Sequence, residues 1–92
     1  MNLPDIRQLK ILIALDETKS FTKAAAKNSI TQSAVSHSIK SLEKQLDCPL
    51  MIRLNRTVTL TKAGQALTYR AKIVIKELET ALALIEKIKD ES

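Results

Sequence analysis

Residues 20–46, SFTKAAAKNSITQSAVSHSIKSLEKQL, contain two helical patterns separated by a three-residue break. The first pattern, over 21–27, repeats apolar and small residues on one face: Phe21, Ala24 and Ala25. The second runs from Thr31 to about Gln45 or Leu46, and its apolar stripe has steps of four, three and four residues: Val35, Ile39, Leu42 and Leu46. Two short helices joined by such a break predict a helix-turn-helix.

Outward from this segment, the chain predicts two more helices and a β-hairpin. Pro4 can sit in the first turn of a helix over about 4–17, because its missing N–H has no partner there in any case. A last helix follows Thr61 and reaches about Ile88. Between the helix-turn-helix and the last helix, two β-prone runs predict a small hairpin or wing. They are Met51-Ile52-Arg53 and Val58-Thr59-Leu60.

Hydroxyl side chains stand where three of the predicted helices begin, and each can accept a hydrogen bond from a free backbone N–H of the first turn. They are Ser20, Thr31 and Thr61. One glycine and two prolines in 92 residues are too few for the turns of an all-β fold. The predicted fold class is mainly α. A winged helix-turn-helix of three helices plus a short β-hairpin wing occupies 1–60, and a long linker or dimerisation helix occupies 61–92.

Basic residues concentrate in the middle of the chain. The formal net charge is +5, and residues 19–56 hold seven cations against two anions. Residues 61–92 hold six cations against five anions. A basic field of this kind favours a polyanion such as nucleic acid, although many basic domains only gain solubility from it.

Composition argues against several other classes. Cys48 is the only cysteine and His37 the only histidine, so neither an intramolecular disulfide nor a metal quartet can form. There is no glycine-rich phosphate loop and no carboxylate cluster, and we therefore expect neither an enzyme nor a cofactor. The lone cysteine suits a reducing cytoplasm, and no apolar run of about 18 residues predicts a membrane span.

The outward face of the second helix of the helix-turn-helix is polar, and Glu43 is the first anion on it. A helix that reads base edges in a major groove about 12 Å wide needs compact hydrogen-bonding side chains in its first turns and few carboxylates. The DNA-binding candidates on this helix and on the wing are Thr31, Gln32, Ser33, Ser36, His37, Lys40, Arg53 and Arg56.

Three of these candidates keep a structural alternative. Thr31 is a helix cap, with or without a contact to phosphate. Gln32 can pair with adenine through two hydrogen bonds, grip a phosphate, or remain an idle surface amide. Ser36 can bind phosphate or bond to carbonyls of its own helix.

Four of the other candidates carry positive charge or can acquire it: His37, Lys40, Arg53 and Arg56. His37 can read a base edge or remain a solvated surface histidine. Lys40 and Lys44 lie one and two turns further along the helix, where phosphate contact is expected. Arg53 and Arg56 flank the wing tip and can enter a minor groove, clamp its phosphates, or belong to a plain solvated loop.

Apolar residues along the last helix repeat with a seven-residue period. They are Leu67, Ala71, Val74, Leu78, Ala81, Ile85 and Ile88. A stripe sustained over three heptads needs a partner helix, and a second copy of the chain is the economical one. We therefore predict a homodimer through 66–88. The alternative, a helix folded back over 4–17, would cover only the first two turns.

Three strings stand in a fixed order and spacing: Ser20-Phe21-Thr22-Lys23-Ala24-Ala25, Thr31-Gln32-Ser33-Ala34-Val35-Ser36, and Leu60-Thr61-x-x-Gly64. With them, nearly the whole chain resembles the N-terminal DNA-binding domain of LysR-type transcriptional regulators. The resemblance implies a winged helix-turn-helix, a linker helix that pairs antiparallel between subunits, and sequence-specific binding of a bacterial regulator to partly symmetric promoter sites.

This chain departs from the family pattern at a few positions. The family usually has Leu, Pro, Gly and Phe where this chain has Asn28, Ser33, Asp47 and Met51, and often Arg where it has His37. Asn28 removes an apolar side chain from beneath the helix-turn-helix. Asp47 stands where glycine would allow a left-handed helix end.

The family normally carries an effector-binding α/β domain beyond the linker helix, and nothing resembling it follows Ser92. We expect an excised domain or a truncated regulator, in which a small-molecule effector would act only through a domain absent from this chain. The predicted function is sequence-specific binding of double-stranded DNA, with helix 31–46 in the major groove and wing 53–57 at the adjacent minor groove. The alternative is a dimerisation or protein-interaction module that binds no specific DNA.

Overall fold

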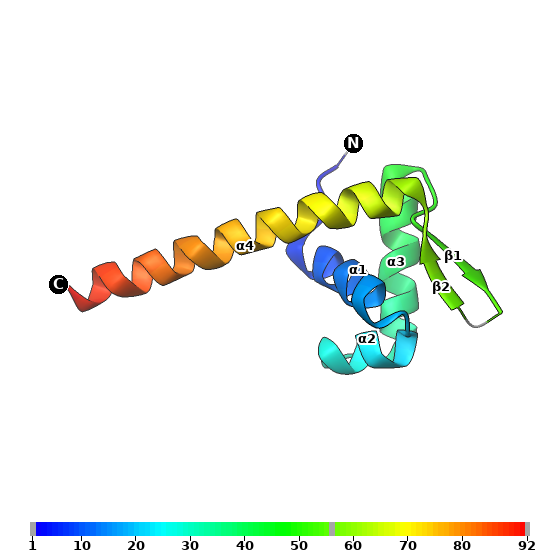
Figure 1. The fold of residues 1–92 in the computed structure, drawn as a ribbon, viewed down its shortest axis with the longest axis horizontal. Coiled ribbons are helices and arrows are strands. Elements are labelled where there is room, and N and C mark those ends of the chain that lie inside the picture. Colours follow the sequence, from blue (N-terminus) through cyan, green and yellow to red (C-terminus); the bar gives the residue numbers. More distant parts are fainter. Residues whose placement is uncertain (1, 56, 92) are drawn as a thin grey trace.

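The computed structural model describes residues 2–55 and 57–91 of the chain (Figure 1). Its elements, in order, are α1 (Ile6–Thr18), α2 (Phe21–Lys27), α3 (Gln32–Leu46), β1 (Met51–Leu54), β2 (Thr57–Leu60) and α4 (Lys62–Asp90). The prediction of a mainly α winged helix-turn-helix followed by a long helix is confirmed. The bounds of α2 and the end of α3 agree with the sequence pattern, and each strand is one residue longer than predicted.

The first helix begins later than predicted. Asp5, and not Pro4, determines where the helix begins. The Asp5 side chain accepts a hydrogen bond from the Gln8 N–H at 2.8 Å, and the Asp5 N–H donates to Gln8 Oε1 at 3.0 Å. This reciprocal capping box satisfies two backbone donors at once, whereas a proline in the first turn would satisfy none. The placement of Pro4 inside the helix was wrong, because it precedes the cap.

The three predicted hydroxyl caps are confirmed. Ser20 Oγ accepts from the Lys23 N–H at 3.1 Å, and Thr31 Oγ1 accepts from the Ala34 N–H at 3.0 Å. Thr61 Oγ1 accepts from the Gly64 N–H at 3.0 Å and donates to the Pro49 carbonyl at 2.8 Å. The Thr61 hydroxyl thus starts α4 and also ties it to the segment before β1.

The core lies where α1 meets α2, α3 and the beginning of α4. Most of its side chains are aliphatic, and the largest that are fully buried are Leu12, Leu15, Val35, Leu42 and Leu50. The predicted stripe of α3 faces this core, with three members buried and Leu46 half-buried. Packing of the apolar stripe against the core therefore determines which side of α3 is exposed to solvent.

The wing is an antiparallel pair in which Met51 faces Leu60 and Arg53 faces Val58 across the strands. Val58 and Leu60 are buried against the body, while the alternate residues Ile52 and Leu54 are exposed. The alternation gives the wing one face on the core and one face in solvent.

The last helix lies over α1 and then projects away from the body (Figure 1). Its buried residues, Gly64, Thr68 and Ala71, all belong to the first ten positions. An ion pair of 3.6 Å between Lys72 Nζ and Asp16 Oδ2 holds α4 to α1 near the end of this contact. Within residues 2–55 and 57–91, no helix has the length and apolar character needed to cross a membrane.

The structure shows how the chain accommodates two of its departures from the family pattern, Asp47 and Asn28. Asp47 has φ 54° and ends α3 in the left-handed region, as predicted for a position that glycine would suit. Asn28 is half-buried, and its Nδ2 donates to the Ala24 carbonyl at 3.0 Å. The amide that replaces an apolar side chain is therefore hydrogen-bonded.

We predict that Gly64→Ala destabilises the fold. A Cβ at this position would lie 2.0 Å from the Leu50 carbonyl oxygen. Alanine favours a helix over glycine by about 1 kcal/mol, but the overlap should reverse this sign and lower the free energy of unfolding by about 1–3 kcal/mol. Urea unfolding followed by circular dichroism measures it. Ala63→Gly, at an exposed neighbour, should lose only the helix propensity, and a Gly64→Ala variant as stable as the parent would contradict the close approach.

We predict that Asp47→Gly stabilises the fold by about 0.5–1 kcal/mol, since glycine adopts the left-handed region without strain but loses more backbone entropy on folding. Thermal unfolding would show a higher Tm. Asp47→Ala separates strain from charge, because it also removes a carboxylate from the unfavourable end of the helix dipole. If the alanine variant gains as much as the glycine variant, backbone strain is not the cause.

Candidate nucleic-acid interface

Five of the eight predicted contact residues lie together on the outer face of α3. They line one shallow hollow of about 350 Å³: Gln32, Ser33, Ser36, His37 and Lys40. Four of them are exposed and Ser36 is half-buried. The hollow contains hydroxyl, amide, imidazole and ammonium groups and no carboxylate, which is the chemistry that base edges and phosphates require.

Thr31 stands at the beginning of this face and caps α3 through its hydroxyl oxygen. The capping interpretation is thus confirmed. The hydroxyl proton is not used by that bond, so its contact with a phosphate stays a prediction.

Gln32 is tied to the preceding helix. Its Nε2 donates to Thr22 Oγ1 at 2.5 Å, joining the first turn of α3 to the first turn of α2. The contact of Gln32 with a base or a phosphate stays a prediction. Thr22 was absent from the predicted site residues, and the only signal for it was its place in the SFT string, because the bond depends on how the two helices cross.

Arg53 projects from β1 toward the body. Its guanidinium lies 4.4 Å from the centroid of the buried Phe21 ring, a cation–π contact. Arg53 also lines a groove of about 240 Å³ between α3 and the wing, together with Ser36 and Lys40. The sequence placed Arg53 beside the wing tip, whereas the structure joins it to the outer face of α3. Arg56, the other wing candidate, lies outside the described residues.

The anion on this face of α3 is engaged by the backbone. Glu43 is half-buried, and its Oε2 accepts a hydrogen bond from the Leu50 N–H at 2.7 Å. One of its carboxylate oxygens is therefore hydrogen-bonded within the protein, while Lys40 and Lys44 are exposed. Lys19 and Lys27 differ from these two lysines, because each pairs with a carboxylate of α1, at 3.0 Å from Asp16 and 3.1 Å from Glu17. Lys40, Lys44 and Arg53 are exposed and add positive charge to this surface.

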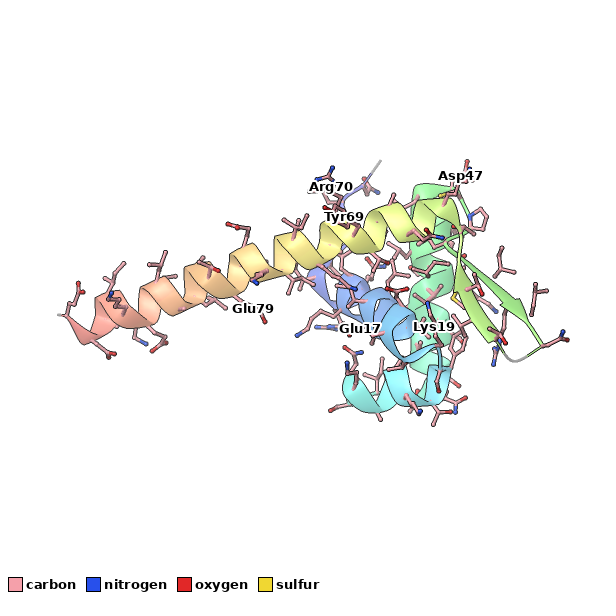
Figure 2. The ribbon with its side chains drawn as sticks, in the orientation of Figure 1. Glu17, Lys19, Asp47, Tyr69, Arg70 and Glu79 are labelled. Atoms are coloured by element: carbon pink, nitrogen blue, oxygen red, sulfur yellow. The ribbon has the colours of Figure 1, made fainter. Side chains whose placement is uncertain are left out.

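The predicted dimerisation stripe of α4 divides into two parts. Leu67 is half-buried and Ala71 is buried, both against the body of their own chain. The later members lie along the projecting part of the helix, where Figure 2 draws the side chains standing clear of the body. Val74, Leu78, Ile85 and Ile88 expose between 45% and 59% of their surface, and Ala81 is also exposed. The fold-back alternative therefore describes only the beginning of the stripe.

In the part of the chain that the structure describes, no three residues among the His, Cys, Asp and Glu side chains are grouped so as to hold a metal ion.

Residues 6–65 match the family described as bacterial regulatory helix-turn-helix protein, lysR family. The chain is 40% identical over 77 residues to the uncharacterized HTH-type transcriptional regulator YfeR of Shigella flexneri, with 84% of this chain and 25% of that protein covered. It is also 40% identical over 79 residues to the glycine cleavage system transcriptional activator of Escherichia coli K12, with 86% and 26% covered. The chain thus spans about a quarter of the length of these curated relatives.

The fold is similar to that of solved structures. In the crystal structure of the BenM_DBD/benA site 1 DNA complex, the protein is 31% identical to this chain with a TM-score of 0.86, and 91% of this chain and 94% of that one are covered.

Proposed function

Because the chain belongs to the lysR family of bacterial regulatory helix-turn-helix proteins, we propose that it binds double-stranded DNA of a specific sequence as part of a homodimeric transcriptional regulator. The observation that carries the proposal is the carboxylate-free hollow on the outer face of α3. An α-helix fits the major groove, and this face of α3 is the one that packing on α1 and α2 leaves outward.

The residues of α3 divide by position. Gln32, Ser33 and Ser36 lie in the first two turns, within reach of base edges and the nearest phosphates, and His37 follows on the same face. Lys40 and Lys44 lie further from the N-terminal end and suit the sugar-phosphate backbone. Thr31 is the cap and a candidate phosphate contact.

The position of the wing also supports DNA binding through the outer face of α3. Arg53 lies in the groove shared with Lys40 and Ser36, so it adds positive charge beside α3, where a phosphate strand would pass. Arg56 is proposed for the adjacent minor groove on its place in the sequence alone. Stacking on Phe21 holds the Arg53 guanidinium beside the helix before any DNA is present.

The similar BenM domain is found in a DNA complex, and the two relatives described above are named as transcriptional regulators. Both facts favour DNA binding over the alternative of a pure protein-interaction module. They also favour a regulatory role without catalysis. Any effector would act through a part of the regulator beyond these residues.

The proposed dimer uses the projecting part of α4. The exposed members of the stripe, Val74, Leu78, Ala81, Ile85 and Ile88, are too regular and too apolar for a solvated helix. A second α4, antiparallel to the first, would cover them by the same contacts on both sides. Such pairing would join two winged domains in one molecule, so that both could contact the same duplex.

We predict that DNA affinity falls with salt and that Lys40→Gln reduces the slope of log K against log salt by about one unit, because one phosphate contact is lost. Fluorescence anisotropy with a labelled duplex at several salt concentrations measures the slope. Lys89→Gln removes the same charge near the far end of α4 and should leave the slope unchanged. Equal slopes for the two variants would remove Lys40 from the interface, and no binding to any duplex in dilute buffer would refute the proposed function.

We predict a dimer in sedimentation equilibrium at tens of micromolar, because an apolar stripe sustained over three heptads needs a partner helix. Leu78→Lys should shift the protein to a monomer, because it puts a charge in the middle of the apolar stripe. Thr80→Lys adds the same charge to the opposite, exposed side of α4 and should remain dimeric. A monomeric parent protein, or two variants that behave alike, would contradict pairing through this stripe.

A further inference from the structure

The bond between Gln32 and Thr22 determines which groups the Gln32 amide can offer to a base. Its Nε2 is the donor and Thr22 Oγ1 the acceptor, at 2.5 Å. Both side chains are exposed, so the bond is formed at the surface of the helix-turn-helix and not in its core. One of the two N–H groups of the amide is therefore engaged within the protein.

The groups that remain are complementary to one purine. With one N–H bound to Thr22, the amide presents one acceptor, Oε1, and one donor, its second N–H. Adenine offers the matching pair in the major groove, an N6 donor and an N7 acceptor. If the amide were turned round, with Oε1 accepting from Thr22, two N–H donors would face outward and match the N7 and O6 acceptors of guanine.

A hydroxyl can donate or accept, so the orientation depends on what Thr22 does with its own proton. A groove of about 350 Å³ runs beside the bond and is lined by Thr22 and Gln32 together with the cations Lys19 and Arg53. A DNA phosphate in this groove would be attracted chiefly by Arg53, because Lys19 is paired with Asp16, and it can only accept hydrogen bonds. Donation from Thr22 to that phosphate leaves its oxygen to accept from Gln32, which is the orientation observed.

We propose that Thr22 is a positioning residue for sequence recognition: it fixes the Gln32 amide so that Gln32 selects adenine over guanine at one position of the DNA site. The proposal rests on the proposed function and deepens it by naming the base and the residue that sets the choice. Thr22 acts through Gln32 and through a phosphate, and needs no base contact of its own.

The test selects bound sequences from a random duplex pool with the 92-residue protein and its variants. Gln32→Ala identifies the position that Gln32 reads, because preference is lost there. At that position the parent protein should prefer adenine to guanine by about tenfold or more, as expected for a two-bond contact. Thr22→Val keeps the β-branched shape but removes the hydroxyl, and should reduce this preference to about twofold or less, while Thr22→Ser should retain it.

Several results would overturn the proposal. One is a parent protein that prefers guanine or a pyrimidine at the Gln32 position, since the orientation of the amide would then be wrong. Another is a Thr22→Val variant that keeps the full adenine preference. A third is a Thr22→Val variant whose affinity falls equally for all sequences, which would make Thr22 a phosphate contact alone. Unfolding of each variant, followed by circular dichroism, separates these results from loss of fold.

Failure of the proposed function gives a different result. A protein that selects no sequence and binds no duplex in dilute buffer would refute DNA binding itself. A protein that binds and selects DNA with a preference independent of Thr22 would refute only the positioning role.

Discussion

The arrangement of α3, the wing and α4 depends on the backbone of Leu50. Its N–H donates to the Glu43 carboxylate of α3 at 2.7 Å, and its carbonyl accepts from the Thr61 N–H at 3.0 Å, just before α4. Gly64 lets α4 come so close that any Cβ would overlap the same carbonyl oxygen. One buried residue therefore ties the last turns of α3, the start of the wing and the first turn of α4 to one another. This explains why the only glycine of the chain stands in a helix, where its propensity is poor.

Local signals predicted much of the fold. Ser20, Thr31 and Thr61 were recognisable as caps because an N-cap bond spans only three residues, and the left-handed end at Asp47 followed from a position that glycine suits. Pro4 was misjudged because Asp5 and Gln8 form a capping box that starts the helix at Ile6, two residues later than predicted. The contacts that shape the candidate site join residues distant in sequence, such as Arg53 on Phe21, and no local pattern predicts them.

The seven-residue stripe of α4 shows how one pattern can meet two requirements. Leu67 and Ala71 face the body of the chain, and the stripe then continues without a change of period into the part of the helix that leaves the body. A period of seven keeps all of these residues on one side, so the surface that α4 packs on the body continues into the surface proposed for the partner helix. The sequence alone showed the stripe. It could not show where the contact of α4 with the body of its own chain ends, because that depends on the length of α1.

The helix-turn-helix also explains how a surface amide can have a defined orientation. A free glutamine at the surface turns easily between its two amide orientations, and a base contact must then oppose the loss of that freedom. Here α2 and α3 are held by the buried Phe21, Ala24 and Val35, so the distance between Thr22 and Gln32 is set by packing beneath them. The apolar side of the motif thereby holds Thr22 and Gln32 within hydrogen-bond distance of each other on its polar side. Substitutions in that core can thus alter sequence preference without touching DNA, provided they change how the two helices cross.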